Sequence, residues 1–174
     1  MLRIVFLSII FLFSTLFGAN AKNPSSAILV KGFGDNTLVF YRPSKMPRAS
    51  SSAALSDMVL DVTISTIDDS ASIKSTHYTS MPLQIDSVII TSGNFVKKYP
   101  IEKIFVESRG RKWEYRLCFN LSKAEFIELT SIETPPVFSF GSEHPLVYAD
   151  KNKSWNRRKN IFNLMLQIID LNDE

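Results

Sequence analysis

Alternation of apolar and polar residues marks the middle of the chain. In the segment 112–121, apolar side chains occupy every second position over ten residues. The segment 58–65 alternates in the same way. A period of two is typical of a strand with one buried face. We therefore expect half-buried strands over both segments. In the strand 112–121, the predicted buried residues are Trp113, Tyr115, Leu117, Phe119 and Leu121.

Shorter apolar runs predict further strands around these two. The runs 27–33 and 37–41 flank Gly34-Asp35-Asn36, whose residues tolerate the positive φ of a hairpin turn. The segment 71–79, after a predicted turn at 68–70, has only Ile73 and Tyr78 as large apolar residues, so we expect it at a sheet edge. The other predicted strands are 86–91, 95–99, 101–107, 137–140 and 146–148.

The segment 42–57 interrupts this pattern. It contains two prolines, five serines and the cations Arg42, Lys45 and Arg48. A polar connection of this length is longer than most connections in compact domains. We expect either a mobile surface loop or the segment that ties the first hairpin to the main sheet.

A helix start is predicted at Ser122. Its side chain can accept from the backbone N–H of Glu125, while the Glu125 side chain reaches back to Ser122, and Leu121 can pack on Phe126. The prolines at 135–136 cannot continue a helix. We therefore predict a short helix near 123–131.

A second helix is predicted from about Trp155 to Leu171, with Ser154 as its cap. Its apolar residues recur at spacings of three and four and form a broad stripe. Strands followed by helices predict an α+β fold, a mostly antiparallel sheet with the short helix near 123–131 and this amphipathic C-terminal helix packed on it. A β-sandwich with a capping helix is the alternative.

The first 21 residues have the pattern of a signal peptide. Arg3 gives a positive start, residues 4–17 are almost entirely apolar, and Ala19-Asn20-Ala21 supplies small residues for cleavage. An uncleaved anchor is the alternative, but a spanning helix needs roughly 20 apolar residues. We expect a secreted or periplasmic protein after cleavage near Ala21, with 22–174 as one soluble domain. Because Cys118 is the only cysteine, we expect no intramolecular disulfide.

Catalytic and metal-binding patterns are weak. A reactive Cys118 would need a neighbouring base, and no motif places His77 or His144 beside it. Together with Glu143 and Asp150, the two histidines make no pattern with metal-ligand spacing. We predict no metal and no cofactor. Glutamates on neighbouring predicted strands, Glu102, Glu107 and Glu114, leave a small secreted hydrolase as an alternative.

Positive charge is concentrated at the start of the C-terminal helix. Residues 151–159 contain five cations and no acid, although the whole chain is only +3. Cations at a helix N-terminus oppose the helix dipole, so local helix stability does not explain them. The predicted ligand-binding residues are Lys151, Lys153, Trp155, Arg157, Arg158 and Lys159.

A second basic group lies on adjoining predicted strands. Its members are Lys97, Lys98, Lys103, Arg109, Arg111, Lys112 and Arg116. Together with the signal-peptide pattern, these two basic groups predict an exported, non-catalytic binding domain. Its partner would be an anionic polysaccharide, a lipid headgroup or an acidic protein. Export and the modest net charge disfavour nucleic acid as the partner. The alternative is a solvated rim that keeps an edge strand from pairing with another molecule.

Overall fold

The computed structural model describes residues 24–33, 36–68 and 70–171. The predicted signal peptide and three predicted turn residues, at 34, 35 and 69, lie outside the described residues. In chain order the elements are η1 (Pro24–Ala27), β1 (Ile28–Phe33), β2 (Asn36–Met46), β3 (Met58–Ser65), β4 (Ser70–Thr79), β5 (Ser87–Ser92), β6 (Phe95–Pro100), β7 (Glu102–Arg109), β8 (Lys112–Ser122), α2 (Lys123–Ser131), β9 (Val137–Phe140), β10 (Leu146–Ala149) and α3 (Asn152–Asp170).

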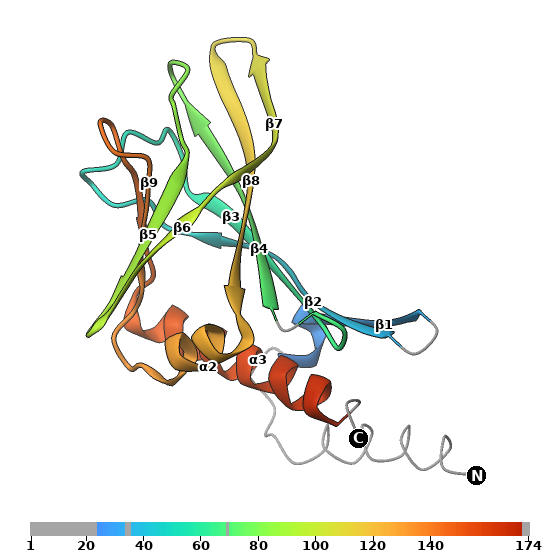
Figure 1. The fold of residues 1–174 in the computed structure, drawn as a ribbon. Helices are drawn as coiled ribbons and strands as arrows, with labels where there is room; N and C mark the ends of the chain where they lie inside the picture. The colour runs from blue at the N-terminus through green and yellow to red at the C-terminus, as the bar shows by residue number, and fades with distance from the viewer. Residues whose placement is uncertain (1–23, 34–35, 69, 172–174) are drawn as a thin grey trace.

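The strands form two antiparallel sheets (Figure 1). The larger sheet has the order β1-β2-β3-β4-β8-β7, and the smaller one has the order β10-β9-β5-β6. In β3, burial alternates along the strand as predicted, with Met58, Leu60, Val62 and Ile64 inside. In β8 the predicted inner residues from Tyr115 to Leu121 are buried, while Trp113 near the strand start is half-buried.

The two sheets are joined along both sides. On one side a single residue, Ile101, separates β6 of the smaller sheet from β7 of the larger one. On the other side the chain just after β2 pairs with β10, through a bridge between Arg48 and Tyr148 and a hydrogen bond of 2.9 Å from Ala49 N to Val147 O. The strands therefore surround a shared interior.

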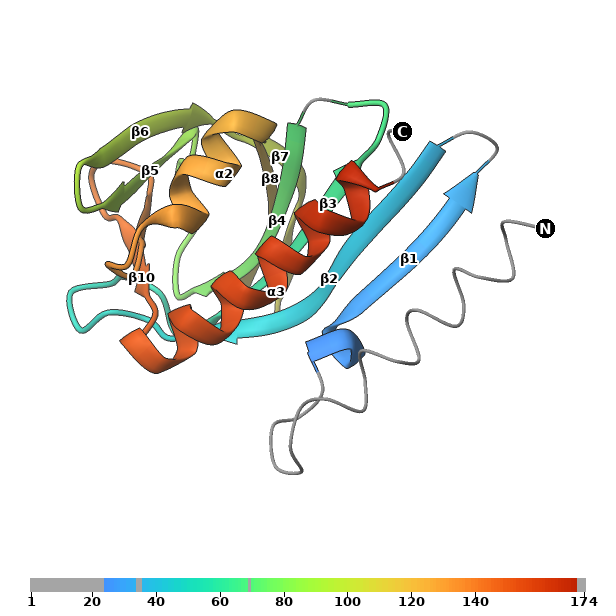
Figure 2. The same cartoon turned by 90° about the horizontal axis from the view of Figure 1, so that it is seen from below.

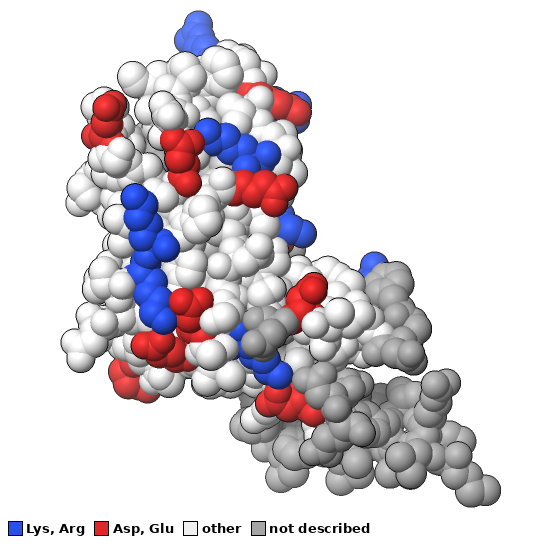
Figure 3. All heavy atoms as spheres, in the orientation of Figure 1, with Lys and Arg blue, Asp and Glu red and all other residues white. Residues whose placement is uncertain are grey.

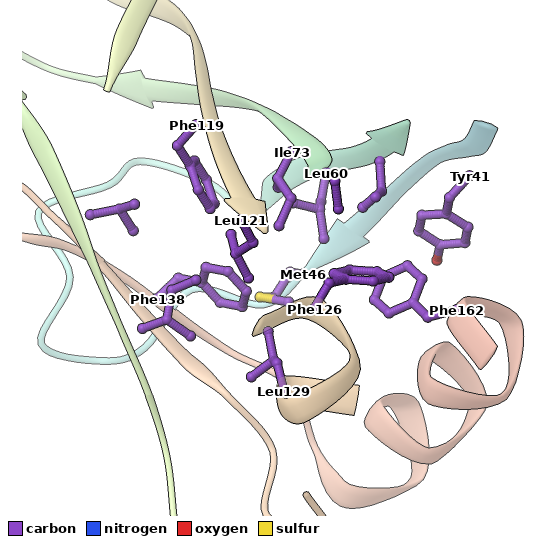
Figure 4. Close-up of a cluster of buried hydrophobic side chains, with 14 of the residues drawn as sticks. Tyr41, Met46, Leu60, Ile73, Phe119, Leu121, Phe126, Leu129, Phe138 and Phe162 are labelled. Carbon is purple, nitrogen blue, oxygen red and sulfur yellow. The ribbon is translucent and has the colours of Figure 1, made fainter. Parts of the chain in front are cut away.

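Two helices cover the rest of that interior. Both α2 and α3 contact the larger sheet and each other, and they lie beside the smaller sheet (Figure 2). Aromatic and aliphatic side chains from the sheets and both helices meet in one core (Figure 4).

The predicted α+β fold, with a short helix at 123–131 and a C-terminal helix on an antiparallel sheet, is confirmed. The two facing sheets of the alternative are also present, through contacts such as Phe119 with Phe138 and Phe140.

The predicted edge position of 71–79 is wrong. β4 lies between β3 and β8, inside the larger sheet. Its inner face is buried although it carries Ser75, His77 and Thr79. Large side chains are not required there because Phe140 and Tyr148 of the smaller sheet pack against His77. A strand poor in apolar residues can therefore be central.

The segment 42–57 is only partly a loop. β2 continues to Met46, and its pairing with β3 shifts register between Tyr41 and Ser44. This irregularity accommodates Pro43, because a bulge needs no regular ladder hydrogen bond from that residue. Of the two expectations, connection to the main sheet is the one that the structure shows for 42–46.

The two helix starts differ from each other. At α2, Ser122 and Glu125 make the predicted capping box, with both hydrogen bonds present. At α3, the prediction that Ser154 is the cap is wrong, because the N-cap residue is Lys151, whose side chain makes no capping hydrogen bond. The earlier start brings Trp155 into the helix on its buried side.

Candidate functional site

The predicted basic site at the start of α3 is divided by the fold. Trp155, Arg158 and Lys159 are buried, whereas Lys151, Lys153 and Arg157 are exposed. The helix turns the first three toward the core, since residues three and four apart lie on one face. The six residues therefore do not form one surface.

Arg158 is held inside the protein by several partners. Its guanidinium pairs with Asp150, at 2.8 Å from Nε to Oδ2, and both side chains are 5% exposed or less. It also donates to the hydroxyls of Tyr41 and Ser44 and to the backbone carbonyl of Lys45. The expectation that the basic residues do not support the fold is wrong for Arg158, because these contacts join α3 to β2.

Trp155 and Lys159 are also used within the fold. The Trp155 indole nitrogen donates to the backbone carbonyl of Ile132, at 3.0 Å. Lys159 pairs with Glu133, at 2.6 Å, so its charge is compensated. Both contacts join α3 to the chain that follows α2.

The exposed remainder is a smaller cationic surface. Lys151, Lys153 and Arg157 have no ion pair within the described part of the chain. Lys45 of β2 is exposed as well, but its backbone carbonyl accepts from the buried Arg158, so this contact does not place its side chain beside the other three. We call Lys151, Lys153 and Arg157 the α3 cationic surface.

The second basic group is largely neutralised. Lys97 pairs with Glu125 and Glu128, and on the face in Figure 3 the blue side chains over β6 end beside the red ones of α2. The other paired members are Lys103 with Asp86, Arg109 with Glu107 and Glu114, and Arg116 with Asp61. Lys98, Arg111 and Lys112 are exposed and have no ion pair with a described residue. Most of this group therefore stabilises contacts between strands or between a strand and α2.

A serine, a histidine and a tyrosine form a hydrogen-bonded chain between the sheets. His77 lies with Nε2 at 2.8 Å from the Ser75 hydroxyl and Nδ1 at 2.9 Å from the Tyr148 hydroxyl. Burial, assisted by the positive charge of Arg116, lowers the pKa of His77 to about 3. All three side chains are fully buried. They cannot meet a substrate, and we interpret them as a structural link between the sheets.

A shallow polar pocket lies where the chain enters β5. It has a volume of about 280 Å³ and is formed by the segment 83–87 and the turn between β9 and β10. Asp86 in its wall accepts from Lys103 and Gln84, which lowers the pKa of that carboxyl group. Glu143 and His144 complete the lining. Sequence reasoning did not bring these residues together, because no periodic pattern links two loops.

The predicted hydrolase carboxylates are only partly assembled. Glu107 and Glu114 are register partners on β7 and β8, but Arg109 pairs with both of them. Glu102 is exposed on β7 near Cys118, its register partner. The pocket described above contains none of the three.

Cys118 lies on the outer side of β8. It is free and buried, and its sulfur is 3.3 Å from the Ser72 hydroxyl. His77 faces the opposite side of the sheet, toward Phe140 and Tyr148. The structure therefore gives this thiol no histidine base within the described residues.

The residues considered for a metal site are separated. Asp150 is paired with Arg158, His77 is between the sheets, and Glu143 and His144 are in the β9–β10 turn. Across residues 24–33, 36–68 and 70–171, no three His, Cys, Asp or Glu side chains are grouped in a way that could hold a metal ion. In the same residues, none of the helices combines the length and apolarity that crossing a membrane requires.

Comparison of the chain with known protein families, with curated proteins and with solved structures gives no match.

Proposed function

We propose that the protein is an exported, non-catalytic binding domain that engages an anionic partner through the α3 cationic surface. The observation that supports this is the set of exposed cations Lys151, Lys153 and Arg157 at the start of α3, which have no ion pair with a described residue. Elsewhere on the strands, four of the seven members of the second basic group have acidic partners. The α3 cationic surface therefore carries positive charge that no described acidic side chain compensates.

The fold gives no reason for this concentration. Lys153 and Arg157 are four residues apart on one face of α3, and like charges at that spacing destabilise a helix by a few tenths of a kcal/mol. Lys153, in the first turn of α3, also lies at the positive end of the helix dipole, which adds a cost of similar size. Charges that oppose helix stability while remaining exposed are suited to an external anion.

Anionic polymers provide the test, since the partner is defined by its charge. On a dextran sulfate column, the wild type should be retained and should elute earlier as salt rises, because exposed charges are screened within about 10 Å at 0.1 M salt. The double variant Lys153→Glu, Arg157→Glu should lose retention while keeping or slightly gaining stability, because an acid at position 153 is favoured at that helix end and the repulsion between positions 153 and 157 is unchanged. Lys31→Glu, Lys98→Glu is the matched control, since it removes the same charge from exposed positions elsewhere.

Two outcomes would contradict the proposal. Wild-type protein that passes through the column at low salt has no useful affinity for polyanions. A control variant that loses retention to the same extent would show that net charge, and not the α3 cationic surface, determines binding.

Export is tested separately from binding. Mass spectrometry of the protein recovered from medium or envelope should give a chain that begins at Lys22, as the Ala19-Asn20-Ala21 pattern predicts. An intact Met1 on membrane-bound protein would instead support the uncleaved anchor.

A further inference from the structure

The end of the strand framework opposite the helices has an exposed apolar surface. The β7–β8 hairpin extends beyond the core at the end farthest from α2 and α3 (Figure 1). Val106 of this hairpin is 38% exposed, and Met81 in the loop after β4 is 49% exposed. Trp113 of β8 is half-buried against the edge of the core. Apolar side chains therefore reach solvent where no helix closes the interior.

Strand register places these side chains on one face. Val106 is the partner of Tyr115, and Ser108 is the partner of Trp113, so all four share the inner side of the hairpin. Thr79, the partner of Trp113 on β4, donates its hydroxyl to the carbonyl of Met81. This bond holds the Met81 backbone close to the row that contains Trp113. Strand pairing therefore fixes Val106 and Trp113, and a side-chain hydrogen bond fixes the chain at Met81.

The tip of the hairpin carries uncompensated positive charge. Glu107 and Glu114 face each other, and Arg109 lies 2.9 Å from the first and 3.2 Å from the second. Arg111 and Lys112 are exposed and have no ion pair with a described residue. A blue side chain projects at the top of Figure 3, at the end of the molecule where this tip lies. Apolar side chains and free cations are thus adjacent on one protrusion.

We propose that this end of the molecule, formed by Met81, Val106, Arg111, Lys112 and Trp113, docks on an anionic lipid surface. Interfacial segments bury their apolar side about 5–10 Å into the headgroup region. Tryptophan is enriched at that level, and lysine and arginine there are attracted by anionic headgroups. An acidic protein surface would match the same cations, and the vesicle experiments separate the two occupants.

Fluorescence of Trp113 provides a direct test. The chain has two tryptophans, and Trp155 is buried against the carbonyl of Ile132. Vesicles that contain phosphatidylglycerol with brominated acyl chains should quench the wild-type emission, whereas neutral phosphatidylcholine vesicles with the same chains should not. Trp113→Phe should remove the quenching and leave the Trp155 emission in place. Soluble glycerol phosphate should not compete, because the site requires a lipid surface.

Charge variants separate this end from the α3 cationic surface. Arg111→Glu, Lys112→Glu should weaken partitioning to the anionic vesicles at least about tenfold. Lys31→Glu, Lys98→Glu, with the same change in charge, should have a much smaller effect. Lys153→Glu, Arg157→Glu should leave the quenching of Trp113 in place even where it abolishes retention on dextran sulfate, so the two proposals can fail independently. The docking proposal is overturned if Trp113 is not quenched by anionic vesicles, or if the quenching persists in Arg111→Glu, Lys112→Glu.

Discussion

At the scale of single residues, the guanidinium of Arg158 is among the most constrained groups in the protein. Its removal from water is offset by Asp150 and by the oxygen atoms of Tyr41, Ser44 and Lys45. A charge pair of this kind adds little net stability over an apolar pair, but loss of one partner leaves the other charge buried and alone.

We therefore predict that Arg158→Ala lowers the free energy of unfolding by about 3–5 kcal/mol. Arg157→Ala, one position away and exposed, should change it by less than about 0.5 kcal/mol. Urea denaturation of the three proteins measures both effects. Equal effects of the two substitutions would contradict the buried ion pair.

His77 is a second residue whose environment sets its behaviour. Its pKa in the folded protein is about 3, below the ordinary value of 6.5, because burial disfavours the charged ring. Below pH 6.5 the unfolded chain therefore binds a proton that the folded protein does not. The stability associated with neutral His77 is complete above that pH and is lost as the pH falls toward 3.

The predicted loss is about 1.4 kcal/mol per pH unit below pH 6, relative to a variant without this group. His77→Gln supplies that variant, and its amide retains hydrogen-bonding groups for Ser75 and Tyr148. His144→Gln, at an exposed turn, is the matched control for the loss of one histidine. Unfolding by urea between pH 4 and pH 8 gives the comparison, and parallel curves for wild type and His77→Gln would exclude the effect.

At the scale of elements, the two helices begin in different ways. α2 has a complete capping box, in which Ser122 accepts from Glu125 N at 3.2 Å and Glu125 accepts from Ser122 N at 3.0 Å. α3 begins at Asn152, and its N-cap residue Lys151 makes no side-chain capping hydrogen bond. Ser154 is exposed and already lies within the helix.

Ser122→Ala is expected to lower the free energy of unfolding by about 1 kcal/mol, because it leaves a helix N–H without its partner. Ser154→Ala should be neutral or slightly stabilising, since alanine is the better helix former. Chemical denaturation compares the two substitutions. A neutral Ser122→Ala would mean that solvent replaces the cap at little cost.

Most elements were predictable because their signals are local. The alternation in β3 and β8 and the capping box at Ser122 each depend on residues within one element. The central position of β4 was not predictable in that way, because it depends on Phe140 and Tyr148, which follow much later in the chain. Burial of Arg158 had a partial signal: the buried stripe of α3 runs back from Ile169 through Phe162 to Arg158 and Trp155 at helical spacing. The charge of Arg158 and of Lys159 favours a surface position for both residues. Only the partners that the fold brings to them reverse that preference.

At the scale of the whole molecule, the candidate surfaces lie at different ends. The α3 cationic surface is beside the helices, whereas the lipid-docking end is the projecting β7–β8 hairpin (Figure 1). Between them, the buried link from Ser75 through His77 to Tyr148 joins the two sheets. Variants at one surface should therefore leave the other folded, and the two proposals can be tested in the same protein.

The junction at Ile101 also has a consequence for the order of folding. Because β6 leads directly into β7, the run from β5 to β8 pairs β5 with β6 in one sheet and β7 with β8 in the other. Its contacts are local, and local contacts form early because little loop entropy is lost. The opposite side closes through Arg48 and Tyr148, and Ser52 there accepts from Val147 N, 95 residues away in sequence.

We therefore expect the side closed by distant residues to form after the rate-limiting step of folding. In stopped-flow kinetics, Ile90→Val in β5 should mainly slow folding, whereas Ser52→Ala should mainly speed unfolding. The reverse assignment of the two rates would show that the distant pairing forms first.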